Sequence, residues 1–255
     1  MRLAVAGGTG LAGRAVVAAI AEAGHQAVVL ARATGVDLVT GAGLDAALTG
    51  VDAVIDVTDH KKPRGAGAFF TTAGTNLLAS ENRSGVTHHV VLSIVGIDRV
   101  DTSYYAAKRG QEQLVADGDV PWTVLRATQF HEFVEQVLGM TPGPLALFPR
   151  MRSQPVAVRE VATALVAHAV GPPVLHAPEL AGPRVEDMVE LARRFVGKGD
   201  RRRWVVPIRV PGAGGRLMAS GGLLPTSSGP RGNQTFDDWL VHRSQALRRT
   251  SEGAA

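Results

Sequence analysis

The feature that most constrains this chain is a glycine-rich loop near its start. Arg2–Ala6 is a short apolar run, and Gly7-Gly8-Thr9-Gly10-Leu11-Ala12-Gly13 leads from it into a segment rich in alanine and valine. A strand, such a loop and a helix in this order open a dinucleotide-binding βαβ unit. Gly7 would permit a tight turn, Gly10 would let the backbone approach a pyrophosphate, and Gly13 would let the helix pack closely on the strand.

The same loop excludes one other kind of phosphate site. Gly13 is followed by Arg14-Ala15, so the Lys-Ser/Thr pair of a P-loop is missing. A plain glycine-rich turn is the remaining alternative. For a dinucleotide, the free N–H groups and the dipole at the start of the helix would bind the phosphates.

The first half of the chain alternates short β-branched runs with helix-like segments, which is typical of a parallel sheet covered by helices. We expect strands at Arg2–Ala6, Ala27–Leu30, Asp37–Val39, Ala53–Val57, His89–Ser93 and Trp122–Leu125. The expected helices are Gly10–Ala23, Leu44–Leu48, Phe69–Asn82 and Tyr104–Ala116. The sequence therefore predicts an α/β fold with a doubly wound parallel Rossmann sheet over residues 1–126.

Beyond Arg126 the alternation becomes irregular. We expect helices at Phe130–Leu138, Val158–Val170, Val185–Phe195 and Phe236–Leu247. Residues 205–233 contain seven glycines and four prolines, which predicts a long loop. Residues 127–255 are accordingly predicted to be a smaller, mixed region that completes the fold and covers the substrate crevice.

Composition excludes several classes of protein. With 45% hydrophobic and 20% charged residues, the 255-residue chain can bury a core and is not disordered as a whole. It has no cysteine, and His131-Glu132-x-x-Glu135 lacks the second histidine of a zincin, so we expect no metal site. No secretory pattern opens the chain, and Gly171-Pro172-Pro173 interrupts its longest uncharged run. We therefore expect a cytoplasmic protein with no membrane partner.

Charge is unevenly distributed along the chain. Residues 1–180 carry 14 Lys and Arg against 16 Asp and Glu, a net charge of −2, whereas residues 181–255 carry 13 against 7, a net charge of +6. The densest basic run is Arg201-Arg202-Arg203 beside Trp204. A nucleic-acid site would spread such residues along a helix or stripe, so we interpret the run as a solvated edge and expect no nucleic-acid partner.

The end of the second predicted strand bears on the choice of dinucleotide. An NAD site places an acid there for the ribose 2′-hydroxyl, whereas this chain has Leu30-Ala31-Arg32, and its next acid is Asp37. The Arg32 guanidinium is placed to bind a 2′-phosphate bidentately. A solvated loop arginine is the alternative. We predict a preference for NADP(H) over NAD(H).

Four stretches together resemble the short-chain dehydrogenase/reductase superfamily, in its atypical, NmrA-like branch of NAD(P)-binding proteins. They are the Gly7–Gly13 loop, Gly74–Leu78, Ser93 with Tyr104-x-x-x-Lys108, and Trp122–Arg126 leading into Gln129-Phe130-His131. The resemblance implies a Rossmann sheet of strand order 3-2-1-4-5-6. It also implies that Asp37 and Leu38 lie by the adenine and that Val57 and Thr58 run past the cofactor.

The resemblance assigns the catalytic roles to Ser93, Tyr104 and Lys108. Tyr104 would exchange a proton with the substrate carbonyl, Lys108 would lower the pKa of the phenol and bind the nicotinamide ribose, and Ser93 would hold the oxygen. A spacing of four residues places Tyr104 and Lys108 on one face of a helix, with Tyr105 out of register. The alternative is that Ser93 ends a strand, Tyr104 packs and Lys108 is a surface cation.

The resemblance also places residues 129–133 beside the substrate pocket. It makes Gln129, Phe130 and His131 candidate substrate contacts, against an ordinary helix-surface histidine at position 131. From these residues we expect an NADP(H)-dependent oxidoreductase that transfers hydride to a carbonyl or quinone, with a small-molecule substrate. Two alternatives stay open. One is a non-catalytic NADP(H) sensor with a protein partner, and the weaker one is a nucleotide-sugar epimerase or dehydratase.

Overall fold

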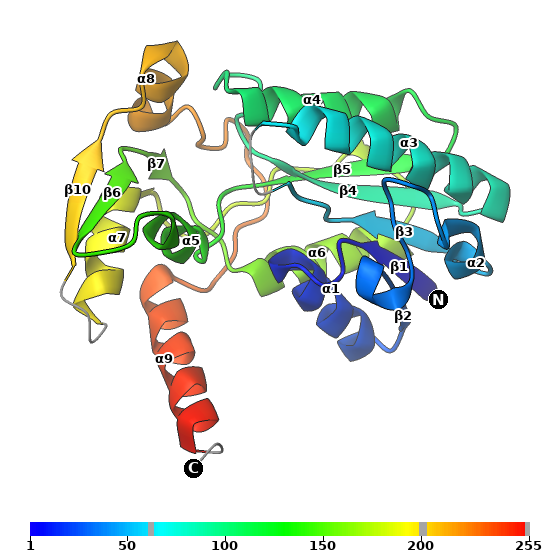
Figure 1. Cartoon of the computed structure of the whole chain (residues 1–255), viewed down its shortest axis with the longest axis horizontal. Helices are drawn as coiled ribbons and strands as arrows, with labels where there is room; N and C mark the ends of the chain where they lie inside the picture. The colour runs from blue at the N-terminus through cyan, green and yellow to red at the C-terminus, as the bar shows by residue number, and fades with distance from the viewer. Residues whose placement is uncertain (61–63, 199–202, 253–255) are drawn as a thin grey trace.

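The protein consists of a large parallel sheet covered by helices and a smaller region with two short sheets (Figure 1). The computed structural model describes residues 1–60, 64–198 and 203–252. Arg201 and Arg202 of the basic run lie outside the described residues. Within the described ranges, no helix combines the length and the apolar character needed to cross a membrane.

Six parallel strands form the central sheet in the order β2-β1-β3-β4-β5-β8. They are β1 (Arg2–Ala6), β2 (Gln26–Leu30), β3 (Ala53–Asp56), β4 (His88–Ile94), β5 (Trp122–Ala127) and β8 (Leu175–His176). Strands β1 and β3 are buried almost throughout because helices cover both faces of the sheet. The carboxyl ends of β1 to β5 meet at one edge, where the glycine-rich loop follows β1.

Helices pack on both faces of this sheet (Figure 1). One face is covered by α1 (Leu11–Glu22) and α6 (Val158–Val170), and the other by α2 (Leu44–Leu48), α3 (Ala66–Ser84) and α4 (Ser103–Ala116). Side chains of α1 and α6 share one core with β1 and β3, which includes Val16, Ile20, Val161, Leu165, Leu3, Val5 and Ile55. The expected doubly wound α/β fold is confirmed.

The predicted strand at Asp37–Val39 is wrong, and the expected sheet order changes with it. The Asp37 carboxylate accepts hydrogen bonds from the backbone N–H groups of Val39 and Thr40 at 2.8 and 3.2 Å, which closes a turn. Such a side-chain bond competes with a strand ladder. A short 3₁₀ turn at Arg32–Thr34 also stands between β2 and this segment. Among the described residues, β2 therefore pairs with β1 alone and forms an edge of the sheet.

The sixth strand comes from the second half of the chain. Leu175 and His176 pair with Thr123 and Val124 of β5, so β8 forms the edge opposite β2. The helix that precedes it, α6, packs on α1. The sheet of the first half is thus completed by residues beyond position 126.

The rest of the second half forms a separate core. Its helices are α5 (Phe133–Met140), α7 (Met188–Gly197), α8 (Gly212–Ser220) and α9 (Phe236–Glu252). Strands β6 (Leu145–Pro149) and β10 (Trp204–Ile208) pair in parallel, and β7 (Arg152–Ser153) pairs antiparallel with β9 (Glu186–Asp187). Phe148, Met188, Leu191, Phe236 and Leu240 are among the buried side chains of this core.

Three predictions for this half are wrong in part. Residues 205–233 are not one loop, because they contain most of β10 and all of α8. The glycines of α8 serve close packing: a Cβ on Gly215 would lie 1.9 Å from the Val210 carbonyl oxygen. Helix α5 begins at Phe133 rather than at Phe130, which pairs with Val156. Helix α7 begins at Met188, after an N-cap at Asp187 whose carboxylate accepts from Val189 N–H.

Candidate functional site

The glycine-rich loop has the close packing that its spacing predicts. Gly7 has a φ of +80°, and its carbonyl accepts a hydrogen bond from the Gly10 N–H at 2.9 Å. A Cβ on Gly13 would lie 2.1 Å from the Gly7 carbonyl oxygen and 2.5 Å from the Gly8 Cα. Only glycine lets α1 approach the loop this closely. The packing role predicted for Gly13 is confirmed.

The start of α1 can accept an anion. Gly10 is its N-cap residue, and no side chain caps the helix, so its first N–H groups have no side-chain acceptor. Thr9 and Gly10 are exposed and Leu11 is half-buried. A Cβ on Gly10 would meet only the Gly7 carbonyl oxygen, at 3.3 Å. The loop therefore fits the diphosphate of a dinucleotide, which would lie against backbone at this point.

The loop after β3 lies directly beside this cradle. A Cβ on Gly7 would come within 3.0 Å of the Val57 carbonyl oxygen and 3.1 Å of the Thr58 Cα. Val57 and Thr58 are themselves buried, and Val57 N–H donates to the carbonyl of Ala6. The structure thus brings together the predicted residues of the first loop and those of the strand end that follows β3.

The end of β2 offers a cation, and no acid stands among residues 30–34. Arg32 is exposed, and its guanidinium has no hydrogen bond or ion pair with any described residue. The carboxylate of Asp37 is engaged in its own turn. Asn76 of α3 donates to the carbonyls of Leu38 and Val39 at 3.0 and 2.8 Å, which fixes that turn against α3.

Tyr104 is aimed at an acid that the sequence analysis did not single out. Its hydroxyl donates to the Asp59 carboxylate at 2.6 Å, and its ring packs edge-on against Phe70. Burial, and then the Asp59 charge and hydrogen bond, raise the pKa of Tyr104 far above its usual value. The resemblance implies a pKa lowered by Lys108. The structure differs because the nearest charged partner of the phenol is an anion.

Lys108 lies on the same face of α4 but is buried. Its ammonium donates to the Leu92 carbonyl at 2.8 Å and to the Gln111 side-chain oxygen at 2.5 Å, and it lies 5.0 Å from the centre of the Phe70 ring. The alternative of a surface cation is wrong, since the residue is only 4% exposed. Burial lowers the pKa of Lys108, and the charges of Asp56 and Asp59 oppose that shift.

A buried network joins Lys108 to the strand end after β3. The Gln111 amide nitrogen donates to the Asp56 carboxylate at 2.7 Å and to the Thr58 hydroxyl at 3.2 Å. Asp56 also accepts from the Thr58 N–H at 2.8 Å. Gln111 therefore bridges a buried ammonium and a buried carboxylate, and this fixes the backbone of Thr58 next to the glycine loop.

Ser93 and Tyr104 are not joined by a hydrogen bond. Ser93 is buried on β4, and its hydroxyl has no partner among the described residues. Ser93 lies two residues after Val91 on β4, so the two side chains are on the same face of the strand. Val91 packs on α3 and α4, so Ser93 faces the same helix layer as Lys108. The strand position is as predicted. The hydrogen-bond contact with a substrate oxygen stays a prediction.

The three predicted substrate contacts lie where the two halves of the chain join. The Gln129 side-chain oxygen accepts from the Ser153 hydroxyl at 2.5 Å, and Gln129 also bonds to Tyr105. Phe130 pairs with Val156 and contacts the core of the first half. His131 is 1% exposed, and its Nε2–H donates to the Gln234 carbonyl at 3.1 Å. It is neither a helix-surface residue nor an open ligand, because Phe236 and Trp239 pack on its ring.

Sequence reasoning missed Asp56, Asp59 and Gln111. A signal for the first two was present: Asp56 ends a buried strand and Asp59 follows it by three residues, at the edge where the strands end. Gln111 lies three residues after Lys108 on α4, and nothing in its local sequence indicates a bridging role. Among the described residues, no group of three or more His, Asp or Glu is arranged to hold a metal ion.

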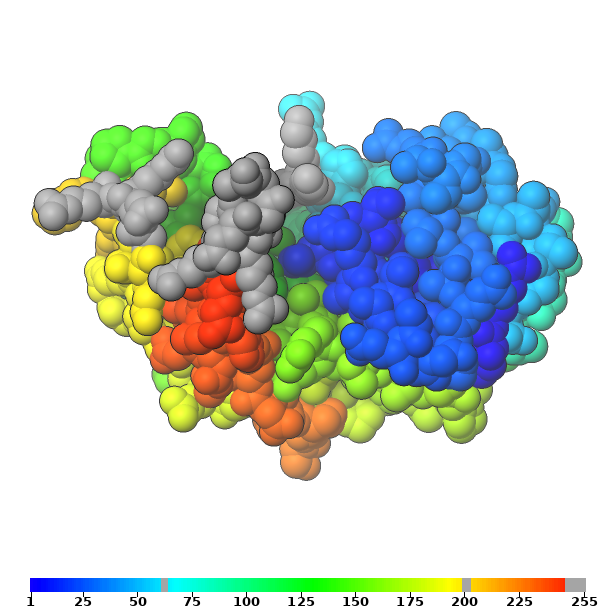
Figure 2. All heavy atoms as spheres, turned by 90° about the horizontal axis from the view of Figure 1, so that it is seen from below, coloured from blue at the N-terminus to red at the C-terminus, as the bar shows by residue number. Residues whose placement is uncertain are grey.

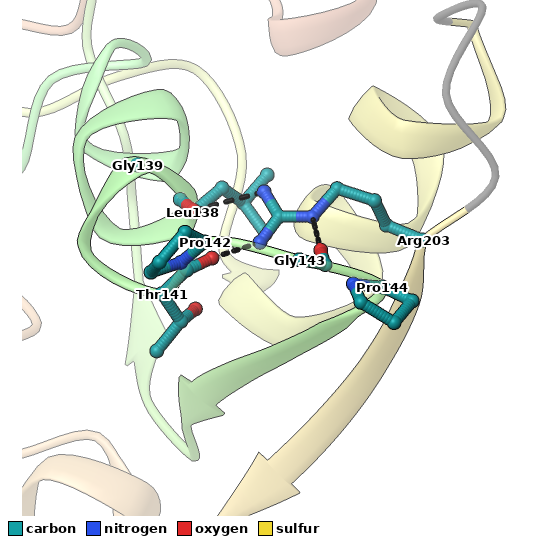
Figure 3. Close-up of a pocket in the computed structure, with 7 residues that line it drawn as sticks. All are labelled: Leu138, Gly139, Thr141, Pro142, Gly143, Pro144 and Arg203. Atoms are coloured by element: carbon teal, nitrogen blue, oxygen red, sulfur yellow. Dashed lines mark hydrogen bonds between the residues drawn. The ribbon is translucent and has the colours of Figure 1, made fainter.

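A furrow separates the two halves of the molecule. Figure 2 shows it between the N-terminal half, in blue, and α9, in red. Two pockets of about 610 and 600 Å³ lie elsewhere, and neither includes a residue of the glycine-rich loop. In the first, Arg203 donates to the carbonyls of Leu138, Thr141 and Gly143, so it caps the end of α5 (Figure 3). The dinucleotide cradle is therefore defined by the strand ends and not by these pockets.

One curated protein is similar in sequence over part of the chain. It is a (4-alkanoyl-5-oxo-2,5-dihydrofuran-3-yl)methyl phosphate reductase of Streptomyces griseus, 34% identical over 154 residues. The match covers 54% of this chain and 50% of that protein, so the chain spans about half the length of this relative. No family model matches the chain.

Solved structures resemble the whole chain at low sequence identity. A short-chain dehydrogenase/reductase superfamily protein of Agrobacterium tumefaciens with bound NAD has a TM-score of 0.68 at 18% identity, covering 100% of this chain and 99% of that one. The NADPH-dependent quinone oxidoreductase of Escherichia coli with NADPH also has a TM-score of 0.68 at 18% identity, covering 94% and 99%. The chain has the same fold as these two dinucleotide-bound structures, the first of which is a short-chain dehydrogenase/reductase superfamily protein.

Proposed function

We propose that the protein is an NADP(H)-dependent reductase that transfers hydride to a conjugated carbonyl compound or a quinone. The observation that carries the proposal is the glycine cradle at the uncapped start of α1, beside the segment after β3 in which Asp59 accepts a hydrogen bond from Tyr104 of α4. The partial relative is a reductase by name, and a similarly folded structure is an NADPH-dependent quinone oxidoreductase, which supports the same class.

The preference for NADP(H) rests on the end of β2. Arg32 is exposed and unpaired among the described residues, so its guanidinium is available to a 2′-phosphate. The nearest acid, Asp37, lies five residues after Arg32, and its Oδ1 accepts two backbone hydrogen bonds that hold it in its own turn. Both features favour the phosphorylated dinucleotide, with Leu38 and the turn beside it placed for the adenine.

The substrate class follows from a feature that two named substrates share. The name of the partial relative describes a 5-oxo-2,5-dihydrofuran with an alkanoyl group, and the other protein is named for quinones. Both compounds have a carbon–carbon double bond conjugated with a carbonyl group. Hydride addition to such a system leaves negative charge on the carbonyl oxygen, and a proton is then taken up to complete the reduction. A hydrogen-bond donor at that oxygen stabilises the charge.

Tyr104 is our candidate for this donor. Its raised pKa keeps the phenol neutral across the physiological pH range, so it suits donation to an oxyanion and not proton abstraction from an alcohol. Ser93, with a hydroxyl that has no partner, is the second candidate for the same oxygen. Lys108 would reach a nicotinamide ribose only after leaving Leu92 and Gln111, so we assign it first to positioning the strand ends. Gln129 and Phe130 would border the substrate from the second half, whereas the buried His131 would not contact it directly.

A paired substitution tests this assignment. NADPH oxidation is screened with quinones and conjugated ketones, and Tyr104→Phe is then compared with Tyr105→Phe. Loss of an oxyanion donor should lower kcat by about 10²-fold or more while NADPH affinity is unchanged. Tyr105 lies in the second core, where burial raises its pKa to about 12 and Gln129 is its partner, so its loss should lower Tm and not kcat. An active enzyme whose kcat survives Tyr104→Phe would contradict the proposal.

A non-catalytic NADP(H) sensor is the second candidate. The burial of Lys108 and the engagement of the Tyr104 hydroxyl by Asp59 favour it, because both groups are already occupied. A sensor would bind NADPH but would not oxidise it, whichever acceptor is added. Its affinity for a protein partner would depend on whether the dinucleotide is bound. Titration of NADPH fluorescence followed by the same acceptor screen separates the two functions.

A further inference from the structure

The small parallel sheet has an apolar outer face. Leu145 and Leu147 on β6 and Trp204, Val206 and Ile208 on β10 are all more than one-third exposed. Leu145 pairs with Trp204 and Leu147 with Val206, so these side chains project from the same face. The residues between them, such as Ala146 and Phe148, are fully buried on the opposite face.

This face is unusual because its largest side chain is its most exposed one. Trp204 is 74% exposed and Leu145 is 56% exposed. In Figure 1, β6 and β10 lie at the end of the molecule opposite the N-terminus, away from the glycine cradle. Contiguous apolar residues of this size on a surface indicate an interaction site.

The charges around the face have one sign. Residues 136–158 and 203–230, which contain both strands and α8, carry five arginines and no aspartate or glutamate. Arg150 follows β6 directly, and Arg209 follows β10, so both stand at the carboxyl end of the sheet. Arg150, Arg209 and Arg216 of α8 are exposed, and their guanidinium groups have no hydrogen bond or ion pair among the described residues.

Acids on the neighbouring elements do not offset this charge. Glu135 of α5 is paired with Arg243, Glu190 of α7 with Arg193, and Asp101, whose backbone contacts α8, with Arg109. The partner of this face must therefore combine an apolar layer with negative charge beside it.

We propose that the outer face of the β6–β10 sheet docks the protein on the surface of an anionic lipid bilayer. Trp204 and the four aliphatic side chains enter the interface between headgroups and acyl chains, where tryptophan is favoured. Arg150, Arg209 and Arg216 bind the anionic headgroups beside them. The proposal departs from the expectation of no membrane partner, because the protein would lie on the bilayer surface, which requires no membrane-crossing helix.

Two other occupants fit this face less well. A second copy of the chain would bring a second set of unpaired arginines against the first, with no carboxylate between them. A nucleic acid would match the arginines, but its phosphates would leave five large apolar side chains without apolar contact. The inference does not depend on the proposed reductase activity, because it concerns a surface remote from the cradle.

Vesicle flotation tests the docking directly. The wild-type protein should float with vesicles of equal parts phosphatidylcholine and phosphatidylglycerol, and not with phosphatidylcholine alone. Arg150→Glu with Arg209→Glu should lower the partition coefficient by about 25-fold or more, since each arginine near an anionic surface contributes about fivefold. Trp204→Ser should lower it as well. Brominated phosphatidylglycerol should quench tryptophan fluorescence in the wild type and not in Trp204→Phe.

Matched controls are available elsewhere on the surface. Val174→Ser removes an exposed apolar side chain beside β8, and Arg159→Glu reverses an exposed charge on α6; both should float like the wild type. Circular dichroism checks that every variant is folded. The proposal is overturned if the wild type does not float at low salt. It is also overturned if Trp204→Ser and the double arginine variant float as well as the two control variants. It also fails if light scattering shows a dimer that Trp204→Ser dissociates, or if duplex DNA competes with the vesicles.

Discussion

Three glycines, Gly10 and Gly13 at the start of α1 and Gly110 on α4, allow folding and dinucleotide binding to be separated. Gly13→Ala places a Cβ 2.1 Å from the Gly7 carbonyl oxygen and 2.5 Å from the Gly8 Cα. Both contacts are with backbone atoms, which cannot rotate away. The free energy of unfolding should therefore fall by about 3 kcal/mol, the upper end of the range for overpacked cores. For a protein of this size that is a decrease in Tm of roughly 6–12 °C. The added methyl group would also push the Gly7–Gly13 loop away from α1, so NADPH binding should be lost as well.

Gly10→Val should affect binding alone. Its Cβ meets only one backbone oxygen, at 3.3 Å, and the φ of −73° suits any residue. The stability cost should stay within about 1 kcal/mol, because valine is a poorer N-cap than glycine. The branched side chain would nevertheless fill the space that the diphosphate needs, so NADPH should no longer bind.

Gly110→Ala is the matched control on α4. Nothing lies within 4 Å of the Cβ it would carry, so alanine should stabilise the helix by about 0.5–1 kcal/mol and leave NADPH binding intact. Differential scanning fluorimetry gives the three Tm values, and titration of NADPH fluorescence gives the three affinities. A Gly13→Ala protein with the wild-type Tm and NADPH affinity would refute the packing argument, and a Gly10→Val protein that binds NADPH would place the diphosphate elsewhere.

Three further predictions concern other residues. NADPH should bind at least about tenfold more tightly than NADH, a difference of about 1.4 kcal/mol, and Arg32→Ala should remove most of that gap in parallel titrations; equal wild-type affinities would contradict the assignment. His89 and Glu81 form a buried pair, and the pKa of each is raised. Burial raises the pKa of Glu81, whereas burial lowers that of His89 and the Glu81 charge raises it by more. The folded state therefore binds more protons than the unfolded state. His89 stabilises the folded state below pH 6.5, the ordinary pKa of histidine, and this contribution should be lost as the pH rises through the raised pKa. The free energy of unfolding should fall by at most about 1.4 kcal/mol per pH unit over that range. Urea unfolding of His89→Gln should not show this fall. Arg203→Ala removes three hydrogen bonds to the end of α5 and should lower Tm by about 4–8 °C, from a loss of about 2 kcal/mol, whereas an unchanged Tm would show that the cap contributes nothing.

The parts of the site that were predictable are those with local causes. The Gly7–Gly13 loop combines turn, helix start and close packing within seven residues, so its spacing alone indicated its structure. The shared face of Tyr104 and Lys108 follows from helix geometry, and both side chains do contact Phe70.

The parts that were missed depend on residues distant in sequence. Asp59 and Tyr104, which form a hydrogen bond, are 45 positions apart in the sequence, and Asp56 and Gln111 are 55 apart. Neither the orientation of the Tyr104 phenol nor the burial of the Lys108 ammonium therefore has a local signal. The same reason explains α8. Its glycines suggested a loop, whereas a Cβ on Gly214 would lie 2.5 Å from the carbonyl oxygen of Asp101, which only the folded chain brings near α8.

The pairing of α6 with α1 has a consequence for how the chain folds as it is synthesised. Val16 and Ile20 emerge early, but the residues that cover them, Val161 and Leu165, are made about 145 positions later. Until then the first half presents an uncovered apolar helix layer and a sheet edge without β8. Contacts of this sequence separation slow folding and prolong exposure to aggregation. A fragment ending at residue 126 should therefore be insoluble when it is expressed alone, because its apolar helix layer stays uncovered.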